Sequence, residues 1–283
     1  MSHARRIAPA LVVGALLVAS AFASGCTETA AETPPAPVPV VSPPVIAEAG
    51  VLRVGVDLDY PPFAGLDDGR EAGIDIDVAD ALAAELGLAV ETVRVEPTRT
   101  AEALAEGEVD VVMSVPLTQA ALTDVSVAGS YASDGPAFFV SVEETGSVVA
   151  TLTVGSVGKS VIGAQEGSRA FWVLEEEFGE GRVTKFATLR AAMSALEAGE
   201  IEVLAGDALV GAYIARDFDT IRFAGQVEPA MPVGVAVKQD ATELEDAVRS
   251  ALDELAAGGV METIRTKWVG DLPALETASP GSS

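Results

Sequence analysis

Two stretches of the chain, ALAEGEVDVVMS (residues 103–114) and ALEAGEIEVLAG (residues 195–206), repeat one pattern 92 residues apart. Each combines the end of a helix, a glycine that stops it and a short apolar run that predicts a buried strand. The repetition indicates two lobes of similar topology. Because ligands of open α/β sheets bind beyond the carboxyl ends of the strands, we expect Ser114 to Thr118 and Asp207 to face each other across a cleft. Helix–Gly–strand is a common pattern, so the repeat alone does not decide whether the two stretches border a cleft.

Strands and helices alternate on both sides of these stretches, from Gly50 onward. Apolar and β-branched runs predict strands at 51–56, 88–95, 109–113, 137–142, 161–164, 183–186, 201–204 and 232–238. Capping residues, glycine stops and apolar stripes predict helices at 75–86, 100–107, 168–178, 189–198 and 244–255, and a last one ending at Trp268. This alternation implies an α/β protein with mostly parallel sheets covered by helices.

The N-terminus has the pattern of a secretion signal. Residues 1–26 read MSHARRIAPALVVGALLVASAFASGC, with a basic start, an apolar run at 10–23 and small residues. The run is shorter than the roughly 20 residues of a membrane-spanning helix. Ala23-Ser24-Gly25-Cys26 resembles the lipobox of bacterial lipoproteins, although an aliphatic residue is more usual where Ala23 stands. The resemblance implies a signal peptide at 1–25 and lipidation of Cys26; the alternative is a free or buried cysteine after an ordinary signal peptide.

The segment after Cys26 predicts a tether. Between Pro34 and Pro44 there are six prolines, and residues 27–48 lack hydrophobic periodicity. Such a segment forms an extended spacer rather than a folded element. Residues 26–49 are therefore expected to link a lipid anchor to a domain that works outside the cytoplasm, on the outer face of the cell membrane.

Composition excludes several function classes. Of 283 residues, 49% are hydrophobic and 21% charged, as in a globular protein. The single histidine is His3 and the single cysteine is Cys26, which excludes a histidine-based triad, a Cys-x-x-Cys motif and a zinc site from the folded part. With 17 Lys and Arg against 43 Asp and Glu the net charge is −26; without Arg5 and Arg6, a chain starting at Cys26 carries −28. This charge disfavours nucleic acid and basic-patch membrane binding.

The folded part resembles family 3 of the bacterial extracellular solute-binding proteins, the polar amino-acid receptors of ABC importers. The resemblance covers residues 50–270 through LRVGVDLDYPPF (52–63), GIDIDVADALAAELGL (73–88), ALAEGEVDVVMS (103–114), IGAQEGSRA (162–170), IEVLAGDALVGAYI (201–214) and ALDELAAGGVMETIRTKWVG (251–270). It implies a type II periplasmic-binding-protein fold, with two mixed, mostly parallel sheets joined by two hinge strands. Lobe 1 would be 50–138 plus 235–272, lobe 2 with the hinge strands 139–234, and 273–283 a disordered tail.

The resemblance also implies ligand-binding residues. The acid and the aromatic of the family's first loop match Asp57 and Tyr60, with Phe63 nearby. The alternative for residues 60–63 is a rigid turn packed over the core. Asp207 matches the aspartate that receives the ligand's α-amino group; its alternative is a helix cap.

At the predicted helix start, Gly167-Ser168 matches a Gly-Ser/Thr pair whose backbone N–H groups suit an anionic group. Arg169 follows where the family usually has Thr or Ser, and it is either a ligand contact or a surface arginine.

One position departs from the family. In the amino-acid-binding members of the family an arginine binds the α-carboxylate of the ligand; the matching position in this sequence is Ala121 or Leu122. Either Arg169 or Arg99 replaces that charge, or the ligand has no α-carboxylate. Several acids could lie near the cleft, namely Asp57, Asp59, Asp134 and Asp207, so a cationic or amine-bearing solute is an option.

The leading hypothesis is a monomeric, lipid-anchored substrate-binding protein without cofactor, metal or catalysis. It would bind a small polar solute, an amino acid or amine, and dock on the permease subunits of an importer. One alternative is an enzyme on the same fold, similar to cyclohexadienyl dehydratases. Another is a ligand sensor for a separate membrane partner.

Overall fold

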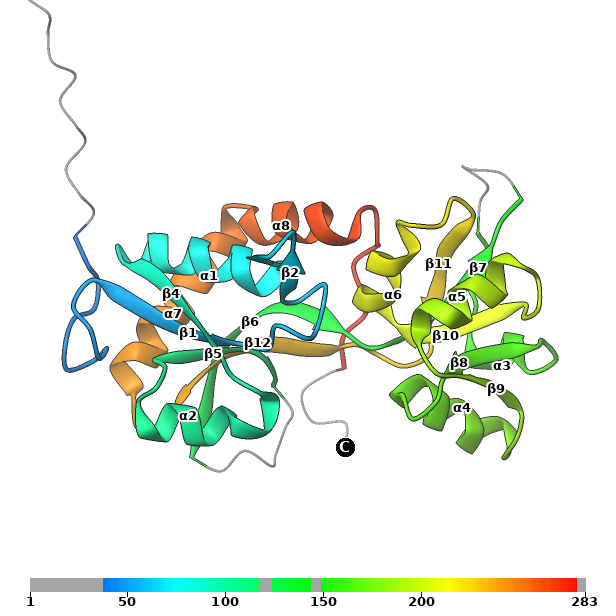
Figure 1. Cartoon of the computed structure of the whole chain (residues 1–283), viewed down its shortest axis with the longest axis horizontal. Coiled ribbons are helices and arrows are strands. Elements are labelled where there is room, and N and C mark those ends of the chain that lie inside the picture. The colour runs from blue at the N-terminus through cyan, green and yellow to red at the C-terminus, as the bar shows by residue number, and fades with distance from the viewer. Residues whose placement is uncertain (1–37, 118–123, 144–148, 279–283) are drawn as a thin grey trace, which may run out of the picture. The chain divides into compact units, whose positions relative to one another are not determined.

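The computed structural model describes residues 38–117, 124–143 and 149–278. They form two five-stranded sheets with helices packed on them, together with a two-stranded hairpin (Figure 1). The strand order is β4-β1-β5-β12-β6 in the first sheet and β11-β7-β10-β8-β9 in the second. We call the part built on the first sheet lobe 1 and the part built on the second sheet lobe 2. The predicted α/β class with mixed sheets is confirmed.

Lobe 1 contains β1 (Val51–Val56), β4 (Ala89–Arg94), β5 (Val111–Pro116), β6 (Val125–Asp134), β12 (Met231–Lys238), the hairpin β2 (Gly65–Asp67) and β3 (Arg70–Ala72), α1 (Ile74–Glu85), η1 (Pro97–Arg99), α2 (Thr100–Glu106), α7 (Thr242–Ala257) and α8 (Val260–Val269). Lobe 2 contains β7 (Pro136–Ser141), β8 (Ile162–Gln165), β9 (Val183–Phe186), β10 (Val203–Asp207), β11 (Ile221–Gln226), α3 (Val154–Val157), α4 (Arg169–Phe178), α5 (Leu189–Glu197) and α6 (Ala208–Ala215). The sequence prediction missed β6, β11, η1, α3, α6 and the hairpin.

The repeated stretches occupy equivalent places in the two sheets. The preceding helices are followed by Gly107 and Gly199, which both have positive φ, 71° and 73°. Strands β5 and β10 are each the central strand, parallel to one neighbour (β1 or β8) and antiparallel to the other (β12 or β7). The two lobes therefore share one topology, as the repeat predicted.

The chain crosses between the lobes at two points. It leaves lobe 1 at Gly135, between β6 and β7, and returns through 227–230. A Cβ at Gly135 would lie 3.0 Å from the Cα of Ala230, so the two crossings pack closely. Both crossings lie a few residues before the expected boundaries at 138/139 and 234/235, because β6 stays paired with β12 as far as Asp134, opposite Met231.

Residues 276–278 run beside the second crossing. Thr277 forms a parallel bridge with Ala230, whose backbone N–H donates to the carbonyl of Glu276 at 2.7 Å. The side chain of Gln226 donates to the same carbonyl and accepts the N–H of Glu276. The expectation of a disordered tail does not hold for these residues, because backbone and side-chain hydrogen bonds tie them to the crossing; 279–283 lie outside the described residues.

The loop after β1 is fixed by the start of α1. The backbone N–H groups of Ile74 and Asp75 donate to the carbonyls of Pro62 and Phe63 at 2.8 and 2.7 Å. Gly73 has φ 149°, and a Cβ there would overlap the carbonyl of Phe63, so the close approach needs glycine. Buried Val78 and Leu82 pack α1 onto the lobe 1 core. The residues around Tyr60 therefore sit on a rigid support.

Candidate functional site

Tyr60 stands on the surface of the first loop, above a buried partner. Its ring is stacked on that of Phe63, with centroids 5.2 Å apart and planes 5° apart. Phe63 is only 2% exposed and belongs to the lobe 1 core, whereas Tyr60 is 41% exposed. Tyr60 is thus accessible to solvent, and Phe63 supports its ring from beneath.

Four carboxyl groups from both lobes act on the Tyr60 hydroxyl. Burial and then their negative charges raise the pKa of Tyr60 well above its ordinary value; in order of effect the acids are Asp134, Asp207, Asp75 and Asp57. Asp59 behaves differently, because its exposed carboxylate pairs with Arg94. None of the four acids forms an ion pair with a Lys or Arg among the described residues.

Asp207 directly precedes α6, yet its side chain does not cap that helix. The cap comes from lobe 1: Oδ1 of Asp134 accepts the backbone N–H of Leu209 at 2.9 Å and that of Gly135 at 2.8 Å. The alternative interpretation of Asp207 as a helix cap is therefore excluded. No hydrogen bond occupies its carboxylate in the described structure, and burial raises its pKa.

Asp75 and Tyr131 extend the cluster, and sequence reasoning did not find them as site residues. Asp75 is 1% exposed; it accepts hydrogen bonds from the Tyr131 hydroxyl at 2.5 Å and from Ser114 Oγ at 2.7 Å. The backbone N–H of Ser114 donates to the Tyr131 hydroxyl at 2.8 Å. Burial raises the pKa of Asp75 to about 6, against the effect of both hydrogen bonds. Ser114, a sequence-predicted site residue, thus holds a buried acid in place.

The lobe 2 residues at the start of α4 are already engaged with the protein. Ser168 is the N-cap and accepts the backbone N–H of Phe171 at 3.2 Å. Arg169, with a side chain 64% exposed, forms a two-pronged ion pair with Glu228, its Nε donating at 2.9 Å. At the other candidate position, Arg99 pairs with Glu102 and Glu108.

Three further predicted positions cannot be placed. Thr118, Cys26 and the pair Ala121/Leu122 lie outside the described residues. Among the residues that the structure does describe, no group of three or more His, Cys, Asp or Glu is arranged to hold a metal ion. Within the same ranges, no helix combines the length and apolar character needed to span a membrane.

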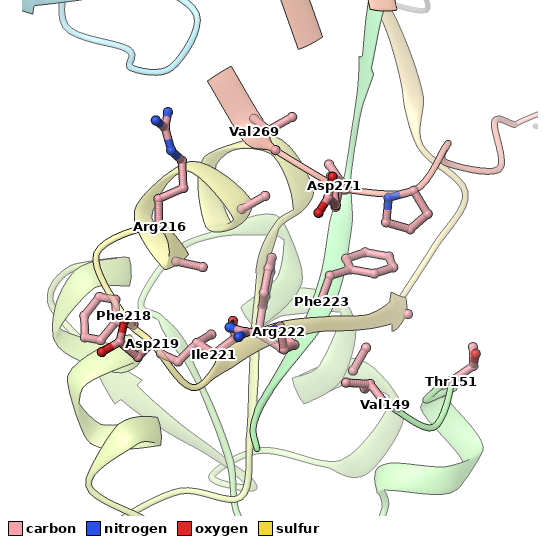
Figure 2. Close-up of a pocket in the computed structure, with 18 residues that line it drawn as sticks. Val149, Thr151, Arg216, Phe218, Asp219, Ile221, Arg222, Phe223, Val269 and Asp271 are labelled. Carbon is pink, nitrogen blue, oxygen red and sulfur yellow. Dashed lines mark hydrogen bonds between the residues drawn. The ribbon is translucent and has the colours of Figure 1, made fainter. Parts of the chain in front are cut away.

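A cavity of about 620 Å³ lies elsewhere, between β11, α6 and residues 269–273, and none of the predicted site residues lines it. Figure 2 shows Val269 and Asp271 on one side of β11, with Val149 and Thr151 on the other. At its rim, Arg216, the C-cap residue of α6, donates to the carbonyl of Trp268 at 3.0 Å and so connects lobe 2 to the end of α8. This cavity is separate from the acids around Tyr60.

Comparison with known proteins agrees with this architecture. The L-arginine-binding protein of Pseudomonas aeruginosa is 26% identical over 246 residues, 81% of this chain and 92% of that protein. The virulence sensor protein BvgS of Bordetella bronchiseptica is 26% identical over 247 residues, 84% of this chain but 19% of BvgS. Among solved structures, an ancestral cationic amino acid solute-binding protein aligns with a TM-score of 0.67 and 26% identity, covering 78% of this chain and 96% of that one.

The curated relatives also include a cystine-binding protein and a putative ABC transporter arginine-binding protein of Escherichia coli and a glutamate-binding protein of Corynebacterium glutamicum. The sequence profile of the bacterial extracellular solute-binding proteins, family 3, matches residues 52–271. The two-lobed fold, the matched sheets and this profile lead to one conclusion: the chain belongs to the bacterial extracellular solute-binding proteins of family 3.

Proposed function

We propose that this chain is the extracytoplasmic substrate-binding component of an ABC importer, and that its ligand is a small solute with an amine or other cationic group. The observation that carries the proposal is the free carboxylate of Asp207, in a cluster of acids around the exposed Tyr60. A carboxylate binds an ammonium group by charge-assisted hydrogen bonds, and an aromatic face accepts a cation.

The ion pairs of Arg169 and Arg99 narrow the ligand class, because these are the two arginines that could replace the family's carboxylate-binding arginine. No Lys or Arg occurs from residue 100 to residue 158, so the family's carboxylate-binding arginine is missing. Arg169 and Arg99, the two possible replacements, are held by Glu228 and by Glu102 and Glu108. A ligand carboxylate would have to compete with these acids for a guanidinium. We therefore infer an amine without an α-carboxylate.

Agmatine and L-arginine test this inference, because they differ only in the carboxylate. We expect agmatine to bind at least as tightly as L-arginine in calorimetry, with a stabilising thermal shift. A carboxylate that found a guanidinium partner would instead favour L-arginine by about 10-fold or more, since such bonds contribute about 1.5–3 kcal/mol. That result would exclude the amine class while leaving solute binding intact. No shift with amino acids, polyamines or quaternary amines would contradict the proposed function itself.

The lipid anchor is part of the proposal and rests on the sequence of residues 1–49. We propose that residues 1–25 are removed and that Cys26 carries lipid, so that the start of the Pro-rich segment tethers the lobes to the membrane near the permease. The predicted linker at 26–49 is too long, because Val41 and Ile46 are buried in the lobe 1 core and Val40 donates a backbone hydrogen bond to Leu86. The mature N-terminus identified by mass spectrometry should be a lipidated Cys26. Cys26→Ser should release the protein from the membrane fraction; retention there would contradict the anchor.

A sensor role is a second candidate, which the similarity to BvgS favours. A strain lacking this chain distinguishes the two functions. Loss of uptake of labelled agmatine supports transport, whereas normal uptake with a lost transcriptional response supports sensing. We expect no catalysis in either case, and turnover of prephenate or arogenate would contradict that expectation.

A further inference from the structure

We propose that Asp134 is a second ligand-binding acid: with Asp207 it forms a carboxyl pair that holds one proton when the cleft is empty and exchanges it for the ammonium group of the ligand. This inference rests on the proposed function, because it assumes an amine-bearing ligand at Asp207. It adds a residue to the site and makes binding depend on pH.

The backbone brings the two acids together at the crossing between the lobes. Asp134 is the last residue of β6, and Asp207 is the last of β10, whose register places it opposite Pro136. The N–H of Ala208 donates to the carbonyl of Gly135 at 2.8 Å, which fixes the start of α6 beside the crossing. Since Asp134 caps α6 through Oδ1, the Asp207 carboxylate is left without that task.

No positive charge offsets the pair among the described residues. Asp134 is affected by the charge of Asp207 at the end of β10. On the side of the first loop lies Tyr60, whose hydroxyl is also affected by the charges of Asp75 and Asp57. On the α8 side, Glu262 and Arg265 line a small cavity with Ser133 and Leu209, but they are paired with each other at 2.6 Å. A ligand cation is the missing counter-charge.

Two partly buried carboxyl groups beside the start of the same helix do not both ionise at low cost. Burial and the charge of Asp207 raise the pKa of Asp134 to about 7, although backbone N–H groups of Leu209, Gly135 and Ala208 lower it. Burial raises the pKa of Asp207 as well. Such groups titrate as a pair, and the first proton bound belongs to both. At pH 7 the empty pair therefore carries about half a proton on average, and at pH 6 close to one.

The exchange balances charge without any other reactant. The ammonium group enters with one positive charge, the shared proton leaves for the solvent, and the pair becomes fully ionised. Below pH 7 the proton competes with the ligand, so affinity falls by up to about tenfold per pH unit. Affinity should be about 100-fold lower at pH 5 than at pH 8.

Calorimetry of the full chain with agmatine tests the exchange. Titrations at pH 6 in two buffers of different ionisation enthalpy should show close to one proton released per agmatine bound. In Asp134→Asn the amide oxygen can still accept both backbone N–H groups, so α6 stays capped while the charge is lost. The difference between pH 5 and pH 8 should shrink from about 100-fold to under about 10-fold. Asp253→Asn, on the exposed face of α7, removes the same charge and should keep the wild-type profile.

A ligand-free measurement separates this inference from the proposed function. In a ¹³C NMR titration the Asp134 carboxyl should titrate near neutral pH, and Asp207→Asn should move its midpoint toward the acid range. Agmatine binding without proton release, or a pH profile unchanged by Asp134→Asn, would overturn the carboxyl pair and leave the amine-binding function standing. Failure of every amine to bind would overturn both.

Discussion

Asp75→Asn should make the protein more stable at neutral pH. Asp75 is buried at 1% exposure, and burial raises the pKa of its carboxyl from 3.8 to about 6. Between pH 3.8 and about pH 6 the Asp75 carboxyl is protonated more often in the folded protein than in the unfolded chain. The free energy of unfolding therefore falls as the pH rises and levels off above about pH 7. At about 1.4 kcal/mol per pH unit, the ionised carboxylate costs the folded state about 3 kcal/mol at neutral pH.

The amide can retain the local hydrogen bonds. Its oxygen can accept from the Tyr131 hydroxyl, as Oδ1 does now, while the Ser114 hydroxyl rotates to accept from the amide nitrogen. An amide and a protonated carboxyl can differ in what they contribute to the free energy of unfolding, but this difference does not depend on pH. It therefore cancels when the same variant is compared with wild type at two pH values. The free energy of unfolding of Asp75→Asn relative to wild type should thus rise by about 2 kcal/mol from pH 4.5 to pH 7.5.

Urea denaturation at both pH values measures this change. With a slope of about 2 kcal/mol per M, the midpoint of the variant relative to wild type should move by about 1 M between the two conditions. Asp253→Asn, an exposed acid on α7, controls for net charge and should show no such movement. A stability difference that is the same at pH 4.5 and pH 7.5 would refute the reasoning that Asp75 is a destabilised ionised acid.

Three other substitutions follow from the contacts described. Arg169→Ala should leave agmatine affinity within about twofold in calorimetry, because the exposed arginine is paired with Glu228; a tenfold loss would place it at the ligand. Gly211→Ala should lower the free energy of unfolding by about 1–2 kcal/mol, because a methyl group there would overlap the ring of buried Phe139; an unchanged urea midpoint would contradict this. Arg216→Ala should lower the free energy of unfolding by about 0.5–1 kcal/mol in the same assay, because the carbonyl of Trp268 at the end of α8 loses its donor. An unchanged urea midpoint would show that water replaces the arginine.

The elements that the sequence predicted well have a local cause. The strand at 51–56 is β1 as expected, because its β-branched residues favour a strand and the loop that follows, rich in Gly, Pro and Asp, ends it. Helix α6 was missed because ALVGAYIA is apolar on every face and contains Gly211, so it has no period that separates it from a buried strand. Strand β6 was missed because its small and polar residues show no period-two alternation, and it is a strand only through pairing with β12.

The site was predictable only where it lies next to a local signal. Asp207 closely follows a predicted strand, which placed it near the expected cleft, whereas Tyr60 was a candidate through the family resemblance of the first loop. Asp134 could be named as a nearby acid, but its role as the cap of α6 depends on a contact between residues 75 positions apart. The sequence predicts Asp75 only as the first residue of a helix, whereas tertiary packing buries it against Tyr131. The position of Asp75 between the apolar Ile74 and Ile76 at the start of α1 was the available signal.

The pairing of residues 276–278 with the second crossing has a practical consequence. Three chain segments, not two, lie where the lobes join, and the third ends close to the C-terminus. A protein shortened after Leu272 keeps every strand of both sheets but loses the hydrogen bonds to Ala230 and Gln226. Its lobes would turn more freely against each other, and the entropic cost of closing them on a ligand would rise. Affinity tags and fluorophores for this protein should therefore be kept away from residues 276–278, so that this joint stays undisturbed.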